Sequence, residues 1–178
     1  MPSIILLLVV AAQRLLELRI AKRNEAWARS RGAKEYGREH YWMFFVLHPL
    51  WMLAFTLEGY FRDAPVQGWA VVAYLILQLL RYSVISTLGP YWNTRILIVP
   101  GGQKVTGGLY RFLKHPNYVV VALEILITPL VVGAWWTALV FSVLNALVMR
   151  VRIPAEERAL REYEGLPRAE GRGPRANR

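Results

Sequence analysis

The chain has 178 residues, of which 55% are hydrophobic and 19% are charged, and it carries 22 Lys and Arg against 12 Asp and Glu. This is the length of one domain, and it is too apolar for an ordinary soluble fold. The absence of Cys excludes disulfide scaffolds, thiolate metal sites and cysteine nucleophiles. Because the basic residues behind the net charge of +10 lie between long apolar runs, we predict a membrane protein rather than a nucleic-acid-binding one.

Five apolar runs follow one another along the chain, and each is close to the roughly 20 residues that a helix needs to cross a bilayer. We predict membrane-spanning helices over about residues 4–20, 41–60, 69–88, 118–132 and 135–151. The last two flank a turn at Gly133 and are expected to form a helical hairpin. Residues 1–164 are thus predicted to be one all-α integral membrane domain with five transmembrane helices. A disordered basic tail that contacts anionic lipid is expected over 165–178.

Lys and Arg residues accumulate in alternate connections between these runs. They crowd segments 19–39 and 89–116 and the region from residue 150 onward, whereas the loop 61–65 contains only Arg62 and the hairpin turn contains none. Short cytoplasmic loops of membrane proteins carry an excess of Lys and Arg. The pattern therefore predicts an N-terminus outside the cell and a C-terminus in the cytoplasm.

Ionisable side chains also fall inside the predicted spans, namely Arg14, Glu17, His48, Glu58, Arg81, Glu124 and Arg150. A charge at mid-bilayer costs roughly 2.5 to 3.5 kcal/mol, so these side chains should face protein or a wet cavity. We interpret Arg14 and the three glutamates as structural ion pairs, and His48 as a packed or capping histidine. The polar face at Arg14 and Glu17 also disfavours a cleaved signal peptide, the alternative for the first run.

Two segments rich in polar and turn residues are expected on the cytoplasmic side, over residues 88–118 and 150–158. The hairpin should bring them together, because its two helices start and finish on the same side. His115 and Tyr118 are three residues apart and share one face of a helical turn, opposite Glu156–Glu157. Each motif by itself is also typical of an ordinary helix start. Their occurrence at the two ends of one hairpin indicates a functional site.

The sequence gives no indication of several other kinds of site, fold and partner. No GxGxxG motif follows a strand and opens a helix, so a dinucleotide-binding Rossmann domain is not predicted. The histidines His40, His48 and His115 are scattered without ligand spacing, so no metal site is expected. The chain shows no duplicated halves of the kind found in many transporters. Neither a nucleic acid nor an obligate protein partner is indicated.

The run Gly108–Tyr118 reads Gly-Leu-Tyr-Arg-Phe-Leu-Lys-His-Pro-Asn-Tyr, and the Glu156–Glu157 pair follows it. Together they resemble the Arg-His-Pro-x-Tyr and Glu-Glu signature of the isoprenylcysteine carboxyl methyltransferase family. Lys114 stands where this family usually has Arg, and Leu109 stands where Pro is common. The likeness is closest to small bacterial members, which include alkylpyrone O-methyltransferases, and it extends over residues 13–18, 21–25, 37–41, 92–95 and 152–157.

The resemblance implies an integral membrane enzyme, in a bacterial inner membrane, that uses S-adenosylmethionine and has no Rossmann domain. It implies a cofactor pocket at the cytoplasmic side of the membrane. By this resemblance the pocket is lined by His115 and Tyr118, and the backbone around Gln103 to Tyr110 closes over it and contributes to cofactor binding. Glu156 and Glu157 would accept hydrogen bonds from the ribose or the ammonium group of the cofactor.

The implied reaction transfers a methyl group to an oxygen of a lipophilic acceptor from the bilayer, such as a prenylcysteine or an alkylpyrone. A carboxylate or an acidic hydroxyl is already largely ionised near neutral pH and needs no strong base. From position and charge, Arg152 or Arg150 is expected to hold the acceptor's anion, and Asn93 to donate a hydrogen bond to it. The alternatives are an amine acceptor, as in phospholipid N-methyltransferases, and a non-catalytic membrane subunit or small transporter.

Overall fold

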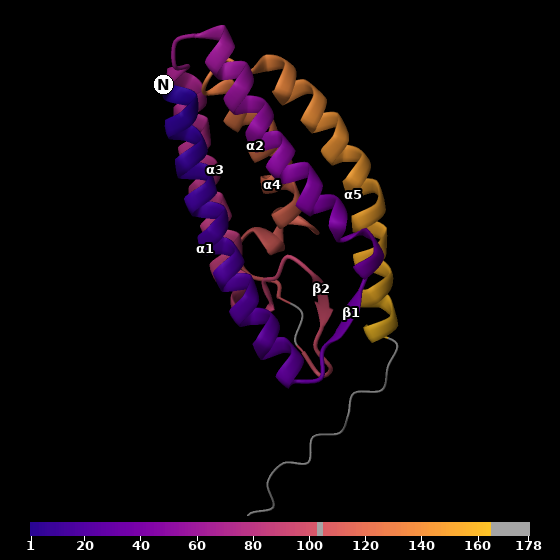
Figure 1. Ribbon diagram of the computed structural model, residues 1–178. Helices are drawn as coiled ribbons and strands as arrows, with labels where there is room; N and C mark the ends of the chain where they lie inside the picture. Colours follow the sequence, from indigo (N-terminus) through magenta and orange to yellow (C-terminus); the bar gives the residue numbers. More distant parts are fainter. Residues whose placement is uncertain (103–104, 165–178) are drawn as a thin grey trace, which may run out of the picture.

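The computed structural model describes residues 1–102 and 105–164, and five long helices make up most of it (Figure 1). The predicted tail over 165–178 lies outside the described residues. The helices are α1 (Pro2–Ser30), α2 (Trp42–Arg62), α3 (Gly68–Leu88), α4 (Pro116–Leu130) and α5 (Trp135–Glu164). The shorter elements are the strands β1 (Lys34–Tyr36) and β2 (Ile96–Ile98) and the 3-10 helices η1 (Arg38–His40), η2 (Gly89–Tyr91) and η3 (Gly108–Arg111).

Two helices extend well beyond the ranges expected from the apolar runs. The first ends at Ser30 instead of residue 20, because the polar stretch after the apolar run still forms helix and carries the Glu25–Arg29 pair at spacing i, i+4, 2.7 Å apart. The last continues through Pro154 instead of ending near residue 151. The glutamates after this proline therefore lie on α5 itself rather than at the start of another helix.

The prediction of purely helical structure is wrong in one place. The strands β1 and β2 pair antiparallel, with Lys34 opposite Ile98 and Tyr36 opposite Ile96. Each strand has only three residues, too few for a period-two pattern to be recognised. The pair ties the connection after α1 to the connection after α3. Within the described part of the chain this is the only sheet, and a Rossmann fold is not formed there.

Three helical segments of the described chain are long and apolar enough to cross a membrane. They are Arg38–Arg62, Gly68–Tyr91 and Trp135–Glu162. The helix α4 is apolar but shorter, and α1 carries Arg14, Glu17 and Arg19. Many large apolar side chains on these helices point outward, for example Leu8, Leu50, Leu79, Trp136 and Leu147. These features are those of a membrane protein, and the count of five spans stays a prediction.

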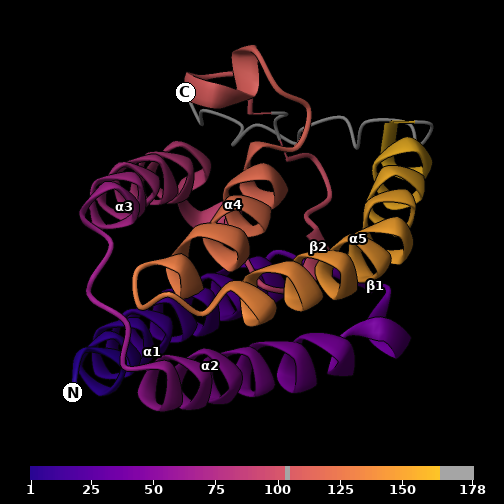
Figure 2. The same cartoon turned by 90° about the horizontal axis from the view of Figure 1, so that it is seen from above.

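The helices form two layers, seen end-on in Figure 2. Helices α1 and α2 lie side by side in one layer, and α4 lies between α3 and α5 in the other. An apolar core joins the layers around Trp51 and Phe55 of α2 and Ile125 of α4. The indole Nε1 of Trp51 donates to the backbone oxygen of Ile125 at 3.1 Å, which satisfies the one polar atom of that buried ring.

The turn between α4 and α5 is tight. Gly133 has φ = +67°, and a Cβ at this position would lie 2.7 Å from the Cβ of Ala64, so a larger residue would be strained and would clash. The carboxylate of Glu58 accepts from the backbone nitrogens of Trp136 at 3.1 Å and Thr137 at 2.7 Å. It thereby caps the N-terminus of α5 from α2, where a negative charge is favourable.

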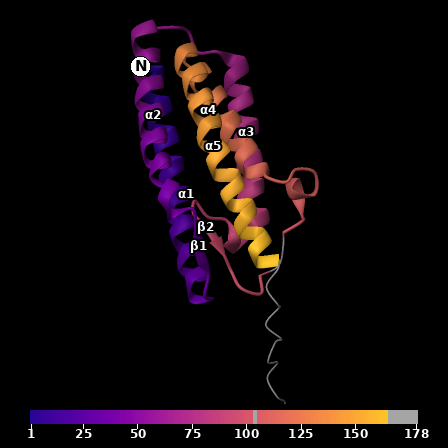
Figure 3. The same cartoon turned by 90° about the vertical axis from the view of Figure 1, so that its right-hand side faces the viewer.

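The two ends of the bundle differ in character. The hairpin turn and the connection between α2 and α3 lie at the end that holds the N-terminus (Figure 1). The strand pair and the C-terminal part of α5 lie at the opposite end, and Figure 3 shows the segment around η3 projecting there beside the helices. The basic segments on either side of the strands therefore share one end, and a large cavity opens beside them.

Candidate functional site

The cavity has a volume of about 1490 Å³ and is lined by side chains of all five helices and by the segment after α3. Ligand sites for single small molecules usually measure roughly 300 to 1,000 Å³. This cavity therefore has room for a polar cofactor together with part of a second molecule. Its wall is polar near the strand end of the bundle. Deeper between the helices, apolar side chains such as Phe44, Met52 and Val121 line it together with buried charged ones.

The polar wall joins the start of α4 to the end of α5. His115 occupies the N-cap position of α4, and its Nε2 lies 3.2 Å from Oε1 of Glu157. The Tyr118 hydroxyl, one turn later, donates to Glu156. Lys114 reaches Glu157 from outside, with its Nζ 2.6 Å from Oε1. The four residues expected to meet across the hairpin are thus in contact, and all four line the cavity.

Arg152 lies one turn before these glutamates on α5 and is only 4% exposed. Its Nη2 donates to the backbone oxygen of Thr94 at 2.8 Å, its Nε donates to the Tyr118 hydroxyl at 3.3 Å, and its guanidinium stacks on Phe44 at 5.4 Å. Its Nη1 is buried and has no hydrogen-bond partner among the described residues. A charged buried donor without a partner is costly, so Nη1 is suited to binding an anionic or strongly accepting group of a ligand.

Tyr110 lies on η3 and lines the same polar wall. Burial, followed by the negative charge of Glu156, raises the pKa of this phenol well above its usual value. The hydroxyl therefore stays protonated at physiological pH and serves as a hydrogen-bond donor, not as a base. The other residue expected in this segment, Gln103, lies outside the described residues.

The two remaining candidates for acceptor binding are placed differently. Asn93 lines the cavity, but its Nδ2 donates to the oxygen of Ala21 at 3.1 Å and its Oδ1 accepts from the nitrogen of Arg95 at 3.0 Å. Arg150 lies outside the cavity, in a separate surface pocket of about 370 Å³ that it shares with His40. Residues two apart on a helix point in nearly opposite directions, so Arg150 and Arg152 cannot both face the cavity.

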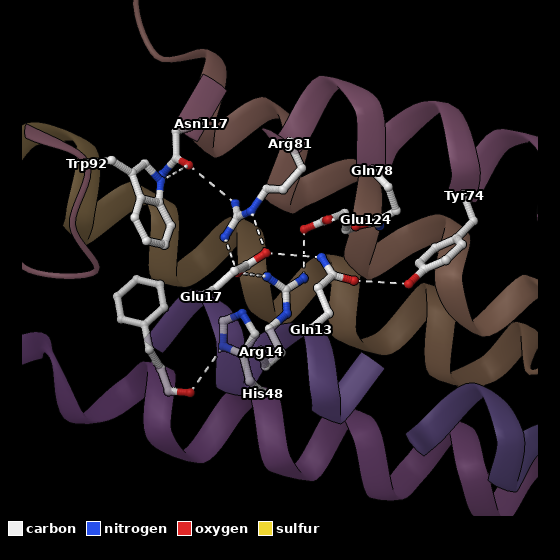
Figure 4. Close-up of polar contacts among 11 residues, drawn as sticks. Gln13, Arg14, Glu17, His48, Tyr74, Gln78, Arg81, Trp92, Asn117 and Glu124 are labelled. Carbon is white, nitrogen blue, oxygen red and sulfur yellow. Dashed lines mark hydrogen bonds and ion pairs between the residues drawn. The ribbon is translucent and has the colours of Figure 1, made fainter. Parts of the chain in front are cut away.

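A buried polar network forms the inner wall of the cavity and joins α1, α3 and α4 (Figure 4). Arg14 pairs with Glu17 at 2.6 Å and with Glu124 at 2.7 Å, and Arg81 pairs with Glu17 at 2.8 Å. Two cations and two anions thus balance one another in a region where an unpaired charge would be expensive. Gln13 extends the network on one side by donating to Glu17 at 3.0 Å.

Sequence reasoning did not identify how this network reaches the candidate site. Arg81 Nη1 donates to Oδ1 of Asn117 at 3.3 Å, and Nε1 of Trp92 donates to the same oxygen at 3.2 Å. Asn117 lies between His115 and Tyr118 and so connects the buried charges to the first turn of α4 (Figure 4). Its position inside the His-Pro-Asn-Tyr motif is the signal in the sequence that points to it.

Comparison with known proteins gives a consistent picture. The model of the isoprenylcysteine carboxyl methyltransferase (ICMT) family matches residues 70–162, which include all four contacting residues of the hairpin site. The chain is 41% identical over 162 residues to Uncharacterized protein YpbQ of Bacillus subtilis (strain 168), covering 89% of this chain and 96% of that protein. It is 29% identical over 157 residues to an Uncharacterized protein of Haemophilus influenzae (strain ATCC 51907 / DSM 11121 / KW20 / Rd), covering 85% of this chain and 90% of that protein.

Proposed function

Because the chain belongs to the isoprenylcysteine carboxyl methyltransferase family, which makes it a membrane methyltransferase, we propose that it transfers a methyl group from S-adenosylmethionine to an oxygen of a lipophilic acceptor. The observation that carries this proposal is one continuous cavity whose polar wall holds His115, Tyr118, Glu156 and Glu157 and whose deeper part is lined by apolar side chains beside the charged network. One end suits a charged, hydroxyl-rich cofactor, and the other suits a hydrocarbon chain.

The residues of the polar wall fit the chemistry of the proposed cofactor. S-adenosylmethionine carries a sulfonium, an ammonium, a carboxylate and ribose hydroxyls. We propose that Glu156 and Glu157 accept from its ribose or ammonium group, and that Tyr110, held protonated, donates to it. His115 and Tyr118 hold the two carboxylates in place through their hydrogen bonds. When bound, the cofactor supplies an electrophilic methyl group.

Arg152 is the residue that we propose to contact the acceptor. It lines the cavity, its guanidinium lies against Phe44, and its buried Nη1 has no hydrogen-bond partner among the described residues. A guanidinium there stabilises negative charge on the acceptor oxygen and holds that oxygen in line with the methyl group. Arg150 and Asn93 do not fit this role, because Arg150 lies in another pocket and the amide of Asn93 bonds within the chain.

Binding of S-adenosylhomocysteine, the demethylated form of the proposed cofactor, tests the proposal. We expect the detergent-purified protein to bind it in calorimetry, and Glu157→Gln and His115→Ala to weaken binding tenfold or more, about 1.4 kcal/mol. The matched control is Glu39→Gln, which removes an exposed carboxylate in the separate surface pocket and should leave the affinity unchanged. A folded wild-type protein that does not bind the ligand would rule out the proposed cofactor.

We further propose that the protein lies in the bacterial inner membrane with its N-terminus outside and the cavity opening toward the cytoplasm. The clustering of basic segments at the strand end of the bundle supports this orientation. Because the chain has no Cys, single-cysteine variants report topology directly. A membrane-impermeant thiol reagent added to whole cells should label Val66→Cys, between α2 and α3, and spare Glu39→Cys. The reverse labelling pattern would invert the assignment.

A further inference from the structure

His48 lies on the wall of the cavity, one turn deeper in α2 than Phe44, and the proposed function does not use it. Its Nδ1 lies 3.1 Å from the backbone oxygen of Phe44. A carbonyl oxygen can only accept a hydrogen bond, so Nδ1 must carry the hydrogen. In the neutral ring, Nε2 then has no hydrogen and presents a lone pair. The backbone of α2 thereby selects one tautomer of this histidine.

The lone pair of Nε2 has no hydrogen-bond partner in the part of the chain that the structure describes. Figure 4 shows the ring beside the charged network. The charged groups that face it are Arg14 and Glu17 on α1 and Arg81 on α3, and both arginines pair with Glu17. On α4, the carboxylate of Glu124 forms an ion pair with Arg14. With Glu124 included, these groups carry two positive and two negative charges, so the network as a whole is neutral.

Arg152 also contacts the Phe44 ring. Its guanidinium carbon is 5.4 Å from the centre of that ring, and the ring of His48 is 6.1 Å from the same centre. Two side chains that contact the same ring and line the same cavity thus carry a hydrogen-bond donor without a partner among the described residues, Arg152 Nη1, and an acceptor without one, His48 Nε2. A hydroxyl group both accepts and donates a hydrogen bond, whereas a carboxylate only accepts.

We propose that His48 Nε2 accepts the proton of the methyl acceptor's hydroxyl group, and that the acceptor is therefore a lipophilic phenol or enol that is protonated at neutral pH. This inference rests on the proposed function and specifies its substrate class. An ionised carboxylate has no proton to donate to Nε2. Its lone pairs would instead repel the lone pair of that nitrogen. An unperturbed phenol has a pKa of about 10 and needs a base to react at neutral pH.

The step balances as follows. The O–H bond of the acceptor breaks and its proton binds to Nε2, which makes the imidazole a cation. The electron pair of the oxygen forms a bond to the methyl carbon, while the bond from that carbon to sulfur breaks and leaves its pair on sulfur. The guanidinium of Arg152 stabilises the negative charge that develops on the oxygen. Nε2 afterwards returns the proton to water in the cavity.

The first test uses His48→Gln, with His40→Gln in the separate surface pocket as its matched control. We expect His48→Gln to bind S-adenosylhomocysteine as the wild type does, and to methylate a long-chain alkylphenol on the order of 10² to 10⁴ times more slowly. The wild-type rate should fall at acidic pH, where the imidazole is protonated, and His48→Gln should lose this dependence. A structural role would lower the rate without changing the pH profile.

The second test needs no turnover. Nitrogen NMR of the imidazole in the wild type, assigned by comparison with His48→Gln, should show the tautomer with hydrogen on Nδ1. Adding the alkylphenol together with S-adenosylhomocysteine should shift the Nε2 resonance. The proposal is overturned if the hydrogen is on Nε2, if the resonance does not respond, or if the wild type methylates a prenylcysteine carboxylate and leaves the alkylphenol unchanged. Failure of the wild type to bind S-adenosylhomocysteine would instead refute the cofactor assignment itself.

Discussion

Replacing Glu17 with Gln removes one charge from the centre of the buried network. Glu17 is only 3% exposed and its carboxylate pairs with Arg14 at 2.6 Å and with Arg81 at 2.8 Å. In Glu17→Gln, Arg81 has only neutral acceptors, namely the new amide oxygen and Oδ1 of Asn117 at 3.3 Å, and becomes a buried cation without a counter-charge. Removing one partner of a buried ion pair costs about 3 to 5 kcal/mol. For a chain of this size that free energy corresponds to a loss of roughly 6 to 20 °C in Tm.

Thermal unfolding in detergent measures this effect. Glu25→Gln serves as the control, because Glu25 lies on the same helix and pairs at 2.7 Å with Arg29, whose side chain is 46% exposed. Exposed pairs contribute only about 0 to 1 kcal/mol, so the control should lose no more than a few degrees. If Glu17→Gln melts within a few degrees of the wild type, the network does not hold the helices together in the way that the contacts indicate.

Two further predictions concern packing and pH. Gly59→Ala should destabilise the bundle by about 1 to 3 kcal/mol in thermal unfolding, because the new methyl group would lie 2.8 Å from Cγ2 of Val132; an unchanged Tm would show that the helices can separate there at no cost. Partial burial acts to raise the pKa of Glu35, but hydrogen bonds from Arg29 and Arg95 hold it below its usual value. The ionised carboxylate therefore stabilises the fold above its unfolded-state pKa, and this stability is lost as the pH falls through the lowered value. Glu35→Gln should flatten the fall of Tm below about pH 5, and an unaltered acid limb would contradict the assignment.

Because the hairpin is tight, the contact between the start of α4 and the end of α5 could be predicted from the sequence. A turn at Gly133 between two apolar runs places the start of one helix beside the end of the next. His115 and Tyr118 share a face because they are three residues apart, and the structure sets them against Glu157 and Glu156. Local periodicity and one turn were sufficient information for this arrangement.

Other features depended on how the helices rotate and pack. Arg150 and Arg152 have the same charge and nearly the same position in the chain, yet only Arg152 faces the cavity. Asn93 lies where a ligand would meet it, but its amide joins two segments of backbone instead. The sequence predicts a packed or capping role for His48. The structure adds that the carbonyl of Phe44 selects the tautomer of its ring.

The sequence by itself determined the membrane character, the helical content, the hairpin and the family of this protein, because apolar runs, helical spacing and short motifs are properties of neighbouring residues. The tertiary structure alone decided which charges neutralise one another and which polar atoms remain without a partner in the cavity. Those outcomes depend on contacts such as that of Arg14 with Glu124, between helices far apart in the chain. The rotation and depth of each helix, set by packing of whole faces, determine such contacts.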